Sequence, residues 1–143
     1  MEQRVSVITL AVNNIEEAVG FYKAMGFKPT AFGDEHFKTF QMNGLILGLY
    51  PNDHLVKDAG HTELKPAGTF GGIALAYNVR AKEEVDAFLA DAVAAGGTIT
   101  RPAEEQFWGG YSGYFTDLDG HGWEVAWNPH WPIDADGNIF LPE

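Results

Sequence analysis

The alternation of apolar and polar residues over the first fifty positions predicts a strand, a helix and three further strands. Residues 5–12 form a short run rich in β-branched side chains, which is typical of a strand. From residue 15 to 25, apolar residues recur at helical spacing, with an asparagine before them as a cap and Gly26 as a stop. Strands are also expected over residues 27–30, 36–42 and 45–50, the last two joined by the hairpin turn Asn43-Gly44.

The same order of elements returns in the second half of the chain. The second helix is expected over residues 84–95, where one face is apolar and Gly96-Gly97 follows as a stop. Its start lacks a hydroxyl cap, because Ala81 stands where a serine would pair with Glu84 in a capping box. Strands are expected over residues 70–77, 97–101, 111–117 and 123–128, with a loop over 102–110 and a hairpin turn at Asp119-Gly120.

The two halves therefore look like an internal duplication. The turn Asn43-Gly44 recurs 76 positions later as Asp119-Gly120, and such a repeat indicates two copies of one unit. We expect an α+β fold in which two βαβββ modules in tandem form a cupped, eight-stranded mixed sheet with the helices on its convex side. The whole chain, 1–143, is interpreted as one domain, with module one over about 4–51, a connector over 52–69, module two over 70–128 and a tail over 129–143.

Composition narrows the function classes. The sequence has no cysteine, which excludes thiol nucleophiles and thiolate metal sites. Its formal net charge of −11 argues against binding to nucleic acid and to anionic membrane surfaces. No apolar run approaches the roughly 20 residues of a membrane span, and the N-terminus leads directly into a strand without a signal peptide. The expected location is therefore the cytoplasm.

Two segments resemble a known family. The first is Ile8-Thr9-Leu10-Ala11-Val12-Asn13-Asn14, together with Phe21-Tyr22 and Gly26-Phe27. The second runs from Gly110 through Asp117-Leu118-Asp119-Gly120-His121-Gly122-Trp123-Glu124 to Val125. Together they are similar to the vicinal oxygen chelate superfamily, which includes glyoxalase I, extradiol dioxygenases and bleomycin-resistance proteins. The resemblance covers nearly the whole chain up to Pro129 and is closest to glyoxalase-like members. It implies paired βαβββ modules around a cupped sheet and a homodimer.

The resemblance also places the ligands of a divalent metal ion. In metal-dependent members, these positions correspond here to Val7, Gly48, Gly72 and Glu124. Only Glu124 offers a donor atom, whereas a catalytic metal site needs about three protein ligands. The implied reading is a metal-free protein without a cofactor. A divalent metal bound by histidines at unrecognised positions is the alternative, although the spacings of the five histidines match no ligand motif.

Strand periodicity then predicts which residues line the cup. Side chains alternate between the two faces of a strand. Residues two positions away from an implied ligand position are therefore expected to face the cup with it, whereas Trp123 and Trp127 are expected to pack beneath the helices. Trp108 and Tyr111 lie on a glycine-rich loop at the expected rim, where aromatic side chains stack on ligands or form an interface. The predicted ligand-binding residues are Val7, Thr9, Gly48, Tyr50, Gly72, Ala74, Trp108, Tyr111, Glu124 and Asn128.

Three interpretations of function follow. Small apolar walls with a few polar anchors are typical of a small-molecule pocket, so the first is a metal-independent binding protein of the glyoxalase and bleomycin-resistance type. The second is an enzyme, a lyase, isomerase or dioxygenase-like protein acting on a small oxygenated substrate, with Glu124 as the catalytic base or as a metal ligand. An interaction domain with a vestigial pocket is a third. In the non-functional interpretation of Glu124, its carboxylate is only hydrogen-bonded to its neighbours.

Overall fold

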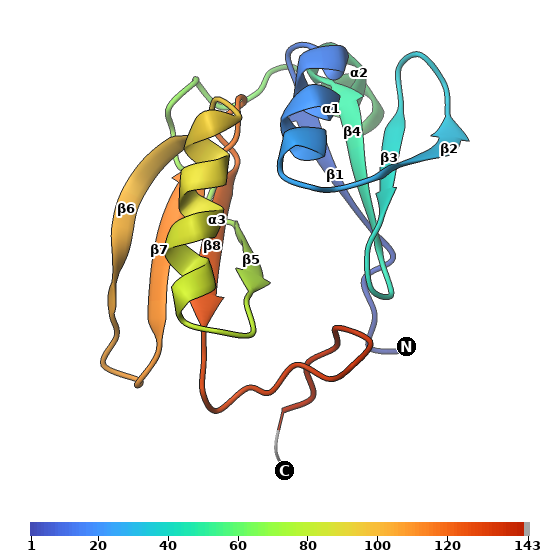
Figure 1. Ribbon diagram of the computed structural model, residues 1–143. Coiled ribbons are helices and arrows are strands. Elements are labelled where there is room, and N and C mark those ends of the chain that lie inside the picture. The colour runs from blue at the N-terminus through green and yellow to red at the C-terminus, as the bar shows by residue number, and fades with distance from the viewer. Residues whose placement is uncertain (142–143) are drawn as a thin grey trace. The chain divides into compact units, whose positions relative to one another are not determined.

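The computed structural model describes residues 1–141 and divides into two compact units, Met1–Thr69 and Phe70–Glu143, called unit 1 and unit 2 below. Each unit contains a four-stranded mixed sheet, in the order β1-β4-β3-β2 in unit 1 and β5-β8-β7-β6 in unit 2 (Figure 1). The first strand of each sheet pairs in parallel with the last, and the other pairs are antiparallel. The α+β class and the tandem βαβββ modules are thereby confirmed.

Unit 1 follows the hydrophobic pattern closely. Asn14 caps its first helix, accepting the backbone N–H of Glu17 at 3.0 Å, and Gly26 follows the helix with a φ of 91°. Tyr22 of this helix stacks on Phe27 and lies against Phe40, which forms the core between helix and sheet. The elements are β1 (Val7–Val12), α1 (Ile15–Ala24), β2 (Pro29–Gly33), β3 (Lys38–Gln41) and β4 (Ile46–Pro51).

A helix that the pattern does not reveal opens the expected connector. Helix α2 (Asn52–Asp58) begins directly after β4, with Pro51 before it, and packs against β1 and β4. None of its residues is buried and no side chain caps its start. A seven-residue helix without a buried stripe has no amphipathic periodicity to read, and the sequence therefore predicted only a connector over these residues.

Unit 2 is built on the same plan. Helix α3 packs against β6, β7 and β8, and covers one face of their sheet (Figure 1). Phe115 and Trp123 stack in the core beneath it, as the predicted facing of Trp123 requires. The elements are β5 (Ala74–Asn78), α3 (Glu83–Ala94), β6 (Thr98–Glu105), β7 (Tyr111–Thr116) and β8 (Gly122–Trp127).

Two strands of unit 2 differ from their predicted bounds. Strand β5 begins at Ala74 instead of residue 70, and Gly72 before it has a φ of 80°, outside the extended region. Strand β6 continues through Pro102 to Glu105, where a loop was expected. Because β6 is the edge strand and its register shifts around Arg101, the missing N–H of Pro102 is tolerated there.

Candidate functional site

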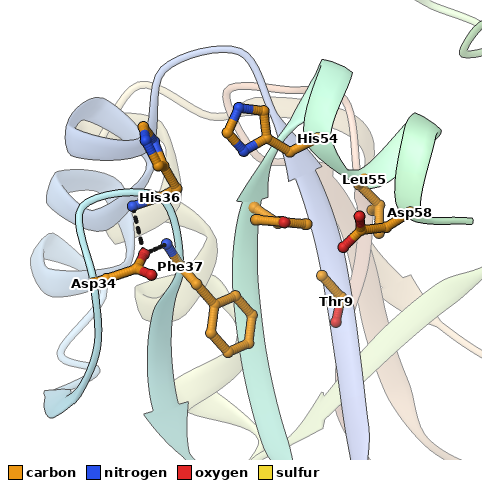
Figure 2. A pocket seen from close by; sticks show the side chains of 8 residues that line it. Thr9, Asp34, His36, Phe37, His54, Leu55 and Asp58 are labelled. Atoms are coloured by element: carbon orange, nitrogen blue, oxygen red, sulfur yellow. Dashed lines mark hydrogen bonds between the residues drawn. The ribbon is translucent and has the colours of Figure 1, made fainter.

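A pocket of about 460 Å³ lies within unit 1, and we call it the unit 1 pocket. Figure 2 shows its two walls: Asp34, His36 and Phe37 come from the turn before β3, and His54, Leu55 and Asp58 come from α2. Thr9 of β1 and Tyr50 of β4 form its floor. Its volume lies within the range of ordinary ligand pockets, roughly 300–1,000 Å³.

Strand alternation explains why the pocket floor is polar. Thr9 pairs with Gly48 in the parallel ladder, and Leu10 pairs with Leu49. Leu10 and Leu49 are buried in the core, so their neighbours Thr9 and Tyr50 point to the opposite face of the sheet. This facing agrees with the sequence prediction for Thr9 and Tyr50, and both residues line the pocket.

The ring of Phe37 occupies the space beside Gly48. A Cβ atom added at Gly48 would lie 2.7 Å from Cε2 of Phe37 and 3.6 Å from Oγ1 of Thr9. The first distance is well below a normal carbon–carbon contact of about 3.5–4.0 Å. A side chain at residue 48 therefore requires the ring to move. At this implied ligand position, the Phe37 ring therefore fills the space that a side chain at residue 48 would need.

Asp34 is held as a carboxylate by the turn in which it lies. Its Oδ1 accepts the backbone N–H groups of His36 at 2.8 Å and Phe37 at 2.9 Å. The hydrogen bond from His36, then that from Phe37, lowers the pKa of Asp34 below its ordinary value. The pocket consequently carries a negative charge on this wall at neutral pH.

Tyr50 joins the floor of the pocket to α2. Desolvation, and then the nearby Asp58 carboxylate, raises the pKa of the Tyr50 phenol. The phenol therefore stays neutral at physiological pH. The Tyr50 ring meets Phe37 edge-on at 5.8 Å and His54 edge-on at 5.5 Å, and His54 lies 4.8 Å from His36, all between ring centroids. Four aromatic rings thus follow one another along the pocket.

Glu124, the predicted catalytic residue, lies in unit 2 within a polar cluster on the face of the sheet opposite Phe115 and Trp123. The Tyr114 hydroxyl donates to Oε2 of Glu124, and this bond, followed by desolvation, raises the pKa of Tyr114. The Arg101 guanidinium lies 4.8 Å from the centre of the Tyr114 ring and donates to Oγ of Ser112 at 3.0 Å. The carboxylate is thus hydrogen-bonded to its neighbour on β7, as the non-functional interpretation expected.

Tyr111, one of the two predicted rim residues, lies on the face of its sheet opposite Tyr114 and Glu124. Tyr111 shares the helix-facing side of β7 with Phe115, donates to Asp86 of α3 and lies beneath Lys82, 5.0 Å from its Nζ. Desolvation and the Asp86 carboxylate raise the pKa of Tyr111. Trp108 is partly buried against Gly110, and Asn128 accepts the backbone N–H of His130.

The remaining predicted residues lie at strand starts. Val7 opens β1 and is exposed, Ala74 opens β5, and Gly72 precedes it. Neither Val7, Gly48 nor Gly72 has a side-chain donor, and within residues 1–141 no three His, Asp or Glu side chains are placed to hold a metal ion. These residues do not fit the metal site that the resemblance implies.

The structure adds four polar residues that strand periodicity did not identify: Asp34, His36, His54 and Asp58. They lie on a turn and on α2, where alternation gives no information about facing. A usable signal was present for one of them, since the pair Gly33-Asp34 is typical of a turn in which the Asp side chain accepts backbone N–H groups that follow it. No comparable signal marks His54 or Asp58.

The chain belongs to the Glyoxalase/Bleomycin resistance protein/Dioxygenase superfamily, whose sequence profile matches residues 4–125. Its fold is also that of a glyoxalase-related enzyme from Fulvimarina pelagi, with 40% sequence identity, a TM-score of 0.89, and coverage of 99% of this chain and 100% of that one. A hypothetical protein from S. aureus is 26% identical with a TM-score of 0.76, covering 88% and 94% of the two chains.

A third structure shares the fold alone. It is a glyoxalase/bleomycin resistance protein/dioxygenase family enzyme from Burkholderia phytofirmans, 20% identical with a TM-score of 0.74, covering 85% of this chain and 96% of that one. No curated protein matches the chain. Among the described helices, none has the length and apolar character needed to cross a bilayer.

Proposed function

We propose that this protein binds a small organic molecule without a resident metal ion, and that the unit 1 pocket holds the ligand. The carrying observation is the contact of Phe37 with Gly48, which puts an aromatic ring where the resemblance expects a metal ligand. The pocket around this ring combines apolar and aromatic side chains, including Tyr50 and Leu55, with several polar groups, and an organic ligand can use both.

Two measurements test the proposal. Elemental analysis of the purified protein is expected to find well under one equivalent of zinc, nickel or iron, and added metal should not raise Tm. A thermal-shift screen of small molecules should give compounds that stabilise the wild type but not the variants Tyr50→Phe and His54→Ala. His61→Ala is the matched control, because His61 is an exposed histidine of the same unit outside the pocket.

The outcomes separate the two parts of the proposal. A stoichiometric metal ion that resists mild chelation would contradict metal independence. Compounds that stabilise Tyr50→Phe and His54→Ala as strongly as the wild type would contradict the unit 1 pocket as the ligand site. The unliganded variants are melted alongside, so that a change in folding is not taken for a change in binding.

An enzyme is the second candidate, and the Tyr114–Glu124 pair favours it. Glu124 is partly exposed and hydrogen-bonded to a tyrosine, an arrangement in which a carboxylate can take a proton from a substrate carbon or oxygen. The relative from Fulvimarina pelagi is described as a glyoxalase-related enzyme. Turnover of any member of a panel of small 2-oxo and 2-hydroxy compounds, lost in Glu124→Gln, would support this candidate over simple binding.

A further inference from the structure

The charges that line the unit 1 pocket have one sign. Asp34 and Asp58 contribute two carboxylates, and no lysine or arginine is among the lining residues. The backbone N–H groups of His36 and Phe37 keep Asp34 ionised, because they lower its pKa. A ligand entering this pocket therefore meets two carboxylates, one on the turn before β3 and one on α2.

The pocket also offers ring faces and edges along its length. Phe37 and Tyr50 meet edge-on at 5.8 Å, and the Tyr50–His54 and His54–His36 contacts continue the series. Aromatic faces attract cations and stack on planar groups. Carboxylates near aromatic rings are the usual surroundings of bound ammonium and amidinium groups, because both attract positive charge.

Tyr50 and Asp58 both line the pocket, and the Asp58 carboxylate is close enough to help raise the pKa of the Tyr50 phenol. Thr9 also lines the pocket and has a hydroxyl of its own. Asp34 and Asp58 come from opposite walls, as Figure 2 shows. A positive group between these walls would face a carboxylate on either side and a ring below.

We propose that the unit 1 pocket takes a small organic cation bearing a planar ring, such as an aromatic amine or amidine in its protonated form. The inference rests on the proposed binding function and narrows its ligand class. An anion of the same size enters against both carboxylates, so the pocket discriminates by charge as well as by shape.

Three naphthalene probes of nearly equal size test this: 1-naphthylmethylammonium, 1-naphthylmethanol and 1-naphthoate. Binding is measured by calorimetry at physiological salt, and the contact is located from chemical-shift changes of the His36 and His54 rings. The cation is expected to bind at least about tenfold more tightly than the alcohol, as a charge-assisted hydrogen bond provides, and the naphthoate should not bind detectably.

Variants separate the pocket carboxylates from the general acidity of the chain. Asp34→Asn keeps an acceptor oxygen for the turn N–H groups, and Asp58→Asn keeps the shape of its side chain. Each should weaken cation binding by about 10- to 100-fold. Asp91→Asn on α3 is exposed, removes the same charge from unit 2, and should leave binding unchanged.

The results distinguish this inference from the proposal beneath it. If the alcohol or naphthoate binds at His36 and His54 as tightly as the cation, the cationic ligand class is overturned while the binding function stands. If Asp91→Asn weakens the cation as much as Asp58→Asn does, the attraction is not local and the inference fails. If no probe and no compound from the thermal-shift screen perturbs the two histidine rings, the binding function itself fails.

Discussion

Tyr114 on β7 lies directly opposite Glu124 on β8, and its hydroxyl donates to the glutamate carboxylate across the ladder. The pair lies on the face of the sheet that α3 does not cover, and the Arg101 guanidinium lies over the tyrosine ring. A carboxylate held in this way contributes to the fold through its hydrogen bond. Its replacement is therefore expected to change stability first.

The stability of Glu124 variants tests that role. Glu124→Leu removes the acceptor and should lower the free energy of unfolding by about 1–2 kcal/mol, because the Tyr114 hydroxyl loses its partner. Glu124→Gln keeps an acceptor oxygen and should cost less. Denaturant melts of both variants and the wild type measure the difference. If Glu124→Leu is as stable as the wild type, the hydrogen bond of the Glu124 carboxylate does not exceed the free-energy cost of removing that carboxylate from water.

The ionisation of Tyr114 provides a spectroscopic readout of the same contact. The hydrogen bond to Glu124 is the main cause of its raised pKa, with desolvation second. Glu124→Gln should therefore lower the pKa of Tyr114, measured by NMR titration of tyrosines labelled at the ring carbon bearing oxygen. Tyr111 is the control: its pKa is raised by desolvation and Asp86, so it should move in Asp86→Asn and not in Glu124→Gln.

The sign of the accompanying stability change follows from the raised pKa. A tyrosine whose pKa is higher in the folded state stabilises the fold fully below the unfolded pKa, about 10, and loses this contribution as the pH rises through the folded value. Alkaline unfolding of Glu124→Gln should accordingly begin at lower pH than in the wild type. If the two proteins lose stability over the same alkaline pH range, the titration of another group controls their alkaline unfolding.

The start of α3 contains half of a capping box. Glu84 accepts the backbone N–H of Ala81 at 2.8 Å and that of Arg80 at 2.9 Å, while Ala81 has no hydroxyl to return the interaction. Ala81→Ser should stabilise the protein by about 0.5–1 kcal/mol. Ala87→Ser, at an exposed position inside the same helix, should be neutral or slightly destabilising. Chemical denaturation measures both, and a midpoint for Ala81→Ser below that of the wild type would contradict the predicted cap.

The sequence predicted the fold well because the fold is carried by periodic patterns. Asn14, Gly26 and the hairpin at Asn43-Gly44 behave as their local chemistry requires, since Gly26 and Gly44 both have positive φ. Elements without such patterns were missed. Helix α2 buries no residue, and β6 passes through Pro102 only because an edge strand can lack one N–H.

The candidate site was predictable only where it lies on strands. Thr9 and Tyr50 were found because alternation fixes their facing, and both line the unit 1 pocket. Asp34 and Asp58 come from a turn and a helix whose positions depend on tertiary packing, which no local pattern reports. For Tyr111, local sequence context was misleading. Its place beside a glycine-rich loop predicted a position at the rim of the cup, but β7 directs it toward α3, where it donates to Asp86.

The contact between Phe37 and Gly48 makes the two positions epistatic. A glutamate or histidine introduced at residue 48 requires the Phe37 ring, which meets Tyr50 edge-on, to move. With a smaller side chain at residue 37, that movement is not needed. The effect of a donor side chain at residue 48 therefore depends on which residue stands at position 37.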